Sequence, residues 1–170
     1  MKTLRRAGRY YRVCDPEWVD CTNAEYAARY GGRWNPPQSF PTLYLNRDIE
    51  TARANARRTY EGEAFGLFDL NPVARPHLQI VEISPCDAVD AVTEAGVRAL
   101  GLPADYPANV GHDRCQSIGQ RCHDEGAAAL ASRSAARDDG EELALFELTL
   151  AAKRQRLAFD DWYIDTPDDP

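Results

Sequence analysis

The segment from residue 31 to residue 45, GGRWNPPQSFPTLYL, restricts the possible folds more than any other part of the chain. Its prolines are incompatible with a helix interior, because proline lacks the backbone N–H and clashes with the preceding turn. Its tryptophan, phenylalanine and leucine residues are of types that are mostly buried, which argues against a plain surface loop. The segment therefore predicts a shaped loop that leads into a buried strand.

Arg33 lies beside aromatic residues in this segment. Its guanidinium offers a planar fork of donors for phosphate or carboxylate, and Trp34 or Tyr44 offers a stacking face. This combination suits a nucleotide-like anion. The alternative is a glycine turn with a proline-rich edge, in which Arg33 forms a structural ion pair. The residue types alone do not decide between the two.

The segment also resembles the opening motif of the RES domain family, through GGRWNPP followed by FPTLYL. The resemblance continues in YRV at 11–13, CQSIG at 115–119, RSAA at 133–136 and ELALF at 142–146. RES domains are the toxins of bacterial toxin–antitoxin pairs, and their fold is related to that of ADP-ribosyltransferases. The resemblance therefore implies a toxin that cleaves the nicotinamide–ribose bond of its substrate NAD.

The resemblance assigns catalytic roles to Arg33, Tyr44, Asn55 and Ser134, and contacts with NAD to Arg12, Arg33, Trp34, Asn35, Tyr44 and Ser134. Arg33 would hold the phosphates, and Tyr44 would stack on nicotinamide or donate its hydroxyl. Tyr44 alternates with two leucines on its strand, so it faces away from them. The alternatives are a core aromatic for Tyr44, a strand-edge arginine for Arg12 and a turn serine for Ser134.

Two positions depart from the family pattern. Arg133 stands where the family usually has proline, so it either alters the loop or adds a cationic group near the phosphates. Asn55 stands where the resemblance implies glutamate. A glutamate would accept a hydrogen bond from the ribose and stabilise the cation that forms at the anomeric carbon. Asparagine keeps the size and can hydrogen-bond a hydroxyl, but it carries no charge and takes no proton.

Asn55 has no carboxylate on its own helix face, since the neighbouring positions hold threonine, alanine and arginine. A replacement would have to come from another segment, such as Glu82 or Glu142. Asparagine is also a mediocre residue for a helix interior, which indicates a specific partner for its amide.

The hydrophobic patterns predict a single mixed α+β domain, and the resemblance implies ADP-ribosyltransferase-like split sheets flanked by short helices, with NAD between the sheets. The expected RES domain spans 1–152, and 153–170 forms a C-terminal edge segment and acidic tail. We expect strands at 8–14, 42–46, 77–84, 87–92, 127–132, 142–151 and 155–164. We expect helices at 22–30, 48–60, 93–100 and 113–125.

Composition restricts the classes of binding partner and the cellular compartment that we expect for this protein. The net charge of −7 argues against nonspecific nucleic-acid binding, although a basic start at 2–12 suggests a solvated terminus that could touch nucleic acid. No apolar run reaches the length of a membrane span, and no apolar stretch follows the basic start as in a signal peptide. The five cysteines lack a CxxC pair, which predicts a reduced, cytoplasmic protein.

A metal site is the weaker interpretation of the cluster formed by His112, Cys115, Cys122 and His123. On a helix the two cysteines are two turns apart and His123 is rotated off their face, which is poor geometry for tetrahedral zinc. We therefore expect no metal, with Cys115 and Cys122 as buried small apolar residues.

The resemblance implies a RES-type toxin that cleaves NAD by hydrolysis, phosphorolysis or ADP-ribosyl transfer. The implied partner is an Xre-type antitoxin with a helix-turn-helix domain, which would plug the pocket and carry the DNA binding. We expect no direct contact with nucleic acid or membrane, and a homodimer is left open. The alternative is a catalytically weakened RES domain that binds a nucleotide or a protein, which Asn55 in place of glutamate would favour.

Overall fold

The structure is a computed structural model, and it describes residues 1–163. Its strands are β1 (Thr3–Cys14), β2 (Leu43–Asn46), β3 (His77–Ala91), β4 (Ala129–Arg133), β5 (Glu141–Leu145) and β6 (Ala151–Leu157). Its helices are α1 (Glu25–Tyr30), α2 (Ile49–Arg58), α3 (Glu94–Ala99), α4 (His112–Asp124) and α5 (Phe159–Trp162). Short 3₁₀ turns lie at η1 (Leu67–Asp69), η2 (Pro72–Ala74) and η3 (Leu148–Leu150).

The strands form one continuous sheet in the order β1-β2-β5-β4-β3-β6, and β1 also pairs with β3. The sheet therefore closes on itself, and the two separate sheets expected from the sequence are joined by the long strands β1 and β3. Only β3 and β4 run parallel among these pairs; the others are antiparallel. The expected single domain of mixed helices and strands is confirmed.

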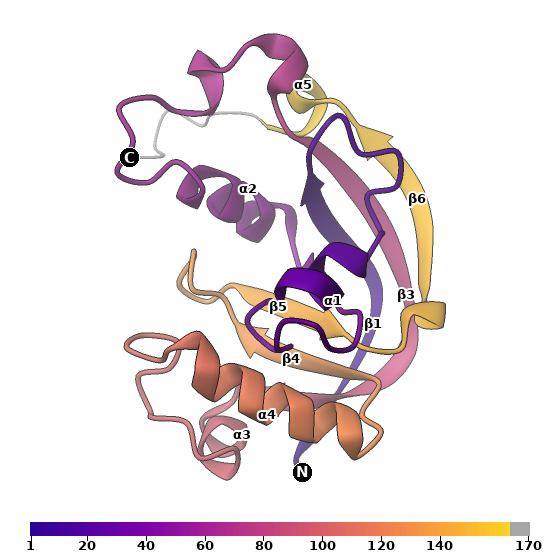
Figure 1. Ribbon diagram of the computed structural model, residues 1–170, viewed down its shortest axis with the longest axis vertical. Coiled ribbons are helices and arrows are strands. Elements are labelled where there is room, and N and C mark those ends of the chain that lie inside the picture. Colours follow the sequence, from indigo (N-terminus) through magenta and orange to yellow (C-terminus); the bar gives the residue numbers. More distant parts are fainter. Residues whose placement is uncertain (164–170) are drawn as a thin grey trace.

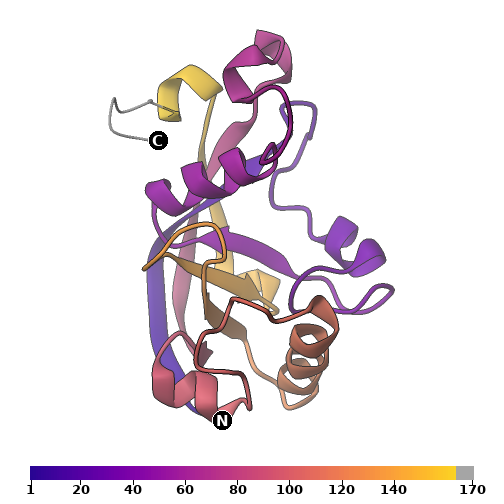
Figure 2. The same ribbon diagram turned by 90° about the vertical axis from the view of Figure 1, so that its left-hand side faces the viewer.

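The sheet is strongly curved, and helices α2 and α4 lie above and below β4 and β5 on its concave side (Figure 1). The view from the side shows α1 and the loop after it projecting from one edge of the sheet, away from α3 (Figure 2). Buried side chains of α4, α3 and the loop before β2 pack on one face of β3, β4 and β5 around Trp34 and Leu130. Leu43 and Leu45 lie in a second cluster on the opposite face.

Helix α2 follows the sequence prediction closely. Asp48 caps its first turn by accepting a hydrogen bond from the Thr51 backbone N–H, at 2.8 Å. Glu50 lies in the first turn and two arginines in the last, which the helix dipole favours. Ala52 and Ala56 are buried as expected. The buried alanines define the inner side of the helix, and Asn55 faces the cavity.

Several predicted boundaries were wrong. The strands expected at 77–84 and 87–92 are one strand, β3, because it pairs with β1 on both sides of an irregularity at Ser84–Pro85. The strand expected at 142–151 ends at Leu145, where the chain turns and both following backbone N–H groups donate to Ala128 O. The edge strand expected at 155–164 lies earlier in the chain, as β6, which pairs with β3. Helix α5 follows it and takes up much of the expected range.

Of the expectations for the two ends of the chain, only the one for the N-terminal end falls on described residues. The basic start is not a solvated terminus, because β1 pairs with β3 from Thr3 onwards. Within it, Arg6 forms a two-pronged ion pair with Glu141, at 2.6 and 2.7 Å. The acidic tail at 165–169 lies outside the described residues.

The expectation of five reduced cysteines was wrong for one pair. Cys14 and Cys21 form a disulfide, since the loop after β1 returns to bring their Cα atoms within 5.7 Å. The remaining three cysteines, Cys86, Cys115 and Cys122, are buried and free. Burial raises the pKa of the Cys122 thiol to about 11. Among residues 1–163, no helix is long and apolar enough to cross a membrane.

Candidate active site

The loop before β2 is shaped by its two glycines. Gly31 ends α1 with a φ of 79°, a conformation that favours glycine. A Cβ on Gly32 would lie 2.5 Å from the hydroxyl of Tyr44, so only glycine lets the tyrosine ring reach the loop backbone. From α4, Gln116 donates a hydrogen bond to Gly32 O at 2.9 Å. The loop is therefore held from both sides.

Helix α4 touches this loop directly at Gly119. A Cβ at this position would lie 1.7 Å from Trp34 O, which leaves no space for any side chain. The segment CQSIG at 115–119 thus supplies a hydrogen bond, a buried cysteine and a close backbone approach, all directed at the loop. Its part in the structure is to hold Arg33 in place.

Two hydrogen bonds hold the hydroxyl of Tyr44 in place. Its hydroxyl accepts a hydrogen bond from the Trp34 backbone N–H at 2.8 Å and donates one to Asn35 Oδ1 at 2.7 Å. Burial raises the pKa of Tyr44. Its ring lines a cavity, on the face of the strand opposite to Leu43 and Leu45, as the alternation predicted.

Trp34 and Asn35 do not lie in that cavity, and the expectation that they contact NAD is corrected. Trp34 is 1% exposed and Asn35 is fully buried. Asn35 Nδ2 donates to Ala27 O at 2.7 Å, so its amide joins α1 to the loop and to Tyr44. Both residues position Tyr44 from behind. Their polar groups are used within the protein.

Two arginines that line the cavity each have a buried guanidinium nitrogen. Arg33 Nη1 is buried and has no hydrogen-bond acceptor among residues 1–163, and Arg12 Nε is in the same situation. Arg12 Nη1 donates to Tyr44 O at 3.1 Å, and burial lowers the pKa of Arg12 to about 10. No ion pair of Arg33 occurs in this part of the chain, so the structural ion pair considered from the sequence is not observed. Buried donors of this kind suit an anionic ligand.

Asn55 faces the same cavity from α2. Its Nδ2 donates to Asn46 Oδ1 at 2.7 Å and to Glu142 Oε1 at 2.9 Å. Ser134, just after β4, donates to the same Glu142 oxygen at 2.7 Å. These residues come from α2, β2, β5 and the end of β4, so the closed sheet brings distant segments to one point.

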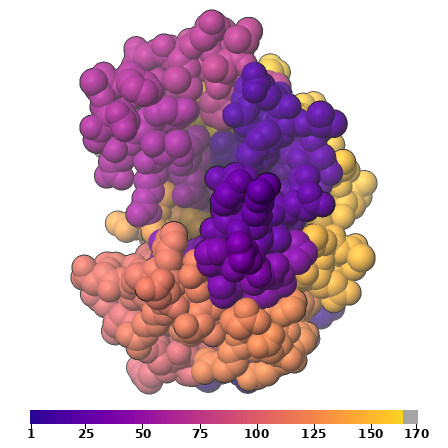
Figure 3. All heavy atoms as spheres, viewed as in Figure 1, coloured from indigo at the N-terminus to yellow at the C-terminus, as the bar shows by residue number. Residues whose placement is uncertain are grey.

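The site comprises two cavities that share Arg33. The smaller, about 470 Å³, is lined by Arg12, Arg33, Tyr44, Asn55 and Glu142 among others. The larger, about 1270 Å³, is lined by Arg33, Arg58, Ser134 and the loop around Tyr106. In the space-filling view a hollow lies between the magenta upper part, the indigo and purple segments and the orange lower part (Figure 3).

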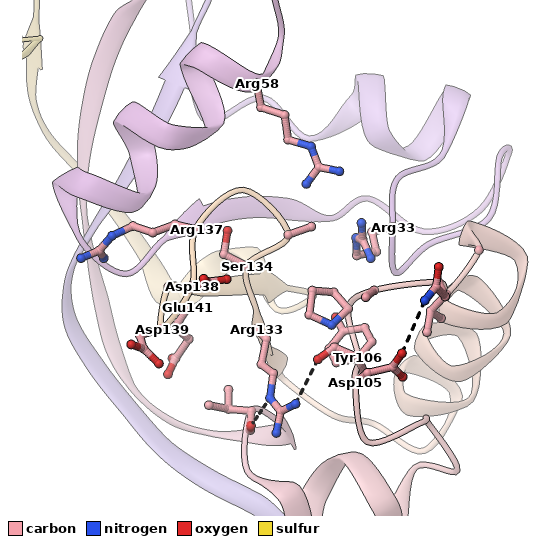
Figure 4. A pocket seen from close by; sticks show the side chains of 18 residues that line it. Arg33, Arg58, Asp105, Tyr106, Arg133, Ser134, Arg137, Asp138, Asp139 and Glu141 are labelled. Carbon is pink, nitrogen blue, oxygen red and sulfur yellow. Dashed lines mark hydrogen bonds between the residues drawn. The ribbon is translucent and has the colours of Figure 1, made fainter. Parts of the chain in front are cut away.

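Arg133 has a structural task in the larger cavity. Its guanidinium donates to the backbone oxygens of Val92, Ala104 and Tyr106, at 2.8 to 3.1 Å. The bond to Tyr106 is drawn in Figure 4. Of the two interpretations from the sequence, the structure thus favours the one in which Arg133 shapes a loop. Arg58 is different, because it extends from α2 towards the open space of the cavity (Figure 4).

The family model described as the RES domain matches residues 9–165 of this chain. The chain belongs to the RES domain family. The recognition made from the sequence is thereby confirmed, and the match covers all of the residues that form the two cavities.

This RES domain is similar to characterised proteins of mycobacteria. The NAD(+) phosphorylase MbcT of Mycobacterium tuberculosis and its namesake of Mycobacterium bovis are each 27% identical over 100 residues. That alignment covers 59% of this chain and 53% of each relative, so the chain spans about half the length of these relatives. The crystal structure of the M. tuberculosis MbcT–MbcA toxin–antitoxin complex matches with a TM-score of 0.78 at 22% identity, over 91% of this chain and 85% of that one. This similarity shows a shared fold.

Sequence reasoning brought together most of this RES site but missed two side chains. Arg12, Arg33, Tyr44 and Asn55 do meet at one cavity, with Ser134 joined to it through Glu142. Glu142 was only one of two suggested carboxylates, and the structure places it in the cavity wall. Arg58 was noted as a helix-end charge on the helix face of Asn55, but not as a site residue. No pattern in the sequence marks either residue as part of a site, because their positions depend on how α2 and β5 pack.

The histidines and cysteines considered as metal ligands have other surroundings in the structure. Among residues 1–163, no group of three or more histidine, cysteine, aspartate or glutamate side chains is placed to hold a metal ion. His123 instead stacks on Phe40, with ring centroids 3.9 Å apart. Cys115 and Cys122 are fully buried, as predicted.

Proposed function

We propose that this RES domain cleaves the bond between nicotinamide and ribose in NAD. The observation that carries the proposal is the buried, unpartnered Nη1 of Arg33, at the junction of two cavities that also hold Tyr44, Asn55 and Glu142. Leaving a buried donor unsatisfied is costly, and a phosphate oxygen would satisfy it. The relatives named NAD(+) phosphorylase support the same substrate.

The expected roles follow from the positions of the side chains. Arg33, with Arg12 behind Tyr44, would hold the pyrophosphate through charge-assisted hydrogen bonds. Tyr44 would present its ring to the nicotinamide end, since its hydroxyl is already engaged with Trp34 and Asn35. Asn55 and Ser134 would lie beside the ribose. Fixed donors and rings of this kind orient the substrate without reorganisation during the reaction.

We propose phosphate as the acceptor. In this reaction the C1′–N bond breaks and its electron pair neutralises the pyridinium nitrogen, while a phosphate oxygen bonds to C1′. The products are nicotinamide and ADP-ribose 1″-phosphate, in which the former C1′ of the nicotinamide ribose is numbered C1″. The name of the relatives favours phosphate, and the larger cavity, with Arg58 exposed in it, has room for a second anion. Hydrolysis, with release of a proton from water, and transfer to a protein are the other acceptor chemistries.

The direct test is to incubate the purified chain with NAD, with and without inorganic phosphate. We expect nicotinamide release that rises with phosphate concentration, and mass spectrometry should detect ADP-ribose 1″-phosphate. Release that is independent of phosphate and yields ADP-ribose would replace phosphorolysis by hydrolysis. Intact NAD after prolonged incubation, with binding shown by calorimetry, would refute the enzyme and leave a binding module.

We also propose that the chain is a cytoplasmic toxin neutralised by an Xre-type helix-turn-helix antitoxin, with no direct contact to nucleic acid. Support comes from an exposed apolar patch, Trp18, Val19, Tyr26 and Tyr30, beside the mouth of the smaller cavity. Exposed apolar patches of this kind mark protein interaction sites. Replacing Val19, which is 99% exposed, with glutamate should abolish neutralisation and leave NAD cleavage intact. The homodimer stays a prediction that ultracentrifugation can check.

The second candidate function is nucleotide or protein binding without turnover. The observation that favours it is Asn55, which replaces the glutamate that the resemblance implies. If this candidate is correct, calorimetry will show NAD binding and no assay will show nicotinamide. The carboxylate of Glu142, 2.9 Å from the Asn55 amide, favours the enzyme instead.

A further inference from the structure

We infer that Glu142 is the catalytic carboxylate of this chain, supplied from β5 in place of a glutamate on α2. The inference rests on the proposed NAD cleavage and concerns which residue stabilises the ribosyl cation. Among residues 1–163, Glu142 is the only carboxylate that lines the smaller cavity. The other candidate from the sequence, Glu82, pairs with Arg9 of β1 and Ala152 of β6 and does not line it.

The hydrogen bonds around Glu142 hold it in a defined orientation. Its Oε1 accepts from Asn55 Nδ2 at 2.9 Å and from Ser134 Oγ at 2.7 Å. No residue of the described chain donates to Oε2, so this oxygen is available to a ligand. A carboxylate with one oxygen fixed and one free is oriented before a substrate arrives, which is the condition for electrostatic stabilisation of a developing charge.

Glu142 also stands on rigid backbone. It pairs with Asn46 of β2 on one side and Ser132 of β4 on the other, in the middle of the sheet. Asn46 Oδ1 in turn accepts from Asn55 Nδ2 at 2.7 Å. The amide of Asn55 is therefore a bridge between two oxygen atoms, and its identity is explained by the carboxylate that it contacts.

Glutamate at position 55 is incompatible with this arrangement. Glutamate is one CH₂ longer than asparagine, so its carboxylate would approach Glu142 Oε1 to about 3 Å or less, where the Asn55 amide now donates at 2.9 Å. Two carboxylates at that separation cannot both ionise without strong repulsion. Asparagine at 55 and glutamate at 142 are thus a matched pair, and the negative charge of the site lies on β5.

The chemical role follows from the reaction. When the C1′–N bond breaks, the electron pair leaves with nicotinamide and positive charge develops on C1′ and the ring oxygen of the ribose. Glu142 Oε2 would accept a hydrogen bond from a ribose hydroxyl and stabilise that charge until a phosphate oxygen bonds to C1′. Glu142 forms no covalent bond, and phosphorolysis requires no proton transfer to it.

The test is an exchange of the two residues, with nicotinamide release measured at saturating NAD and phosphate. Glu142→Gln should lower kcat by about 10²–10³, the usual effect of removing one preorganised electrostatic contact. Its KM should change less than about fivefold. Asn55→Glu should also lower kcat, because the second carboxylate displaces the first. The double variant, Asn55→Glu with Glu142→Asn, should have a kcat at least tenfold above that of Asn55→Glu or Glu142→Gln. The effects of substitutions at two residues in contact are not additive.

The control is Glu147→Gln, which removes a charge just beyond the end of β5 from an exposed side chain outside both cavities. Thermal unfolding identifies any variant whose loss of activity reflects misfolding; for such a variant Glu142→Asp, which keeps the charge, must retain more activity than Glu142→Gln. An Asn55→Glu variant faster than the parent, or a Glu142→Gln variant equal to it, would overturn the inference while NAD cleavage stands. A parent without turnover would instead refute the proposed function itself.

Discussion

Replacing Arg33 distinguishes a role in ligand binding from a role in stabilising the fold. Because Arg33 Nη1 has no acceptor within residues 1–163, Arg33→Ala removes no intramolecular hydrogen bond of that nitrogen. We therefore expect the free energy of unfolding to change by less than about 1 kcal/mol. A structural arginine would behave differently, since breaking a buried ion pair costs about 3–5 kcal/mol.

Binding of NAD should respond in the opposite way. A charge-assisted hydrogen bond contributes about 1.5–3 kcal/mol, and a guanidinium fork on pyrophosphate makes two. Arg33→Ala should then weaken binding by about 3–6 kcal/mol, which is on the order of 10²–10⁴ in Kd. Arg33→Lys keeps a point charge but not the fork, so it should lose about 10–100-fold.

Calorimetry on the parent and both variants gives the affinities, and urea unfolding gives the stabilities. Arg98→Ala serves as the control, because it removes an exposed arginine from α3, outside both cavities. Equal affinity of the lysine variant and the parent would refute the fork. A large loss of stability in Arg33→Ala, with unchanged affinity, would refute the assignment of Arg33 to the ligand.

Three further predictions concern the framework of the site. Gly119→Ala should lower the free energy of unfolding by about 1–3 kcal/mol or more, because its Cβ would meet Trp34 O at 1.7 Å. Gly111→Ala has open space around its Cβ, so it should change the free energy of unfolding little. Urea unfolding of the two variants compares them. Arg133→Ala should destabilise by about 1–3 kcal/mol and expose the loop at 104–106 to proteolysis, since three backbone oxygens lose their donor; an unchanged cleavage rate would contradict this. Thiol titration in denaturant should count three free thiols without reductant, corresponding to Cys86, Cys115 and Cys122, and five thiols would contradict the Cys14–Cys21 disulfide.

The features that sequence predicted well are those set by neighbouring residues. The cap at Asp48, the helix end at Gly31 and the alternation around Tyr44 each depend on a few consecutive positions. They gave the direction of Tyr44 and the bounds of the helix that carries Asn55, while the resemblance to the RES family grouped these residues with Arg33, and the structure places all three on one cavity. Trp34 and Asn35 were misassigned because a loop sequence does not show which side chains turn inward.

Contacts between distant segments set the features that sequence missed. The length of β3 depends on its pairing with β1, and no local pattern shows that the strand continues through Ser84–Pro85, where its register with β1 shifts. The anchoring of the loop at 104–106 depends on Arg133, which lies nearly thirty residues further along the chain. Such contacts appear only when the sheet closes.

The position of Glu142 shows most clearly why the site needed a structure. Glu141 and Glu142 are adjacent and chemically identical, but successive side chains of a strand point to opposite faces. Glu141 pairs with Arg6, whereas Glu142 faces Asn55 and Ser134. A shift of one residue in the pairing of β5 with β2 and β4 would exchange the two glutamates. The pairing of Leu143 with Leu45 and Ala131 sets that register, and these residues are buried on the face opposite to the cavity. The apolar core thus decides which of the two glutamates faces Asn55 in the smaller cavity.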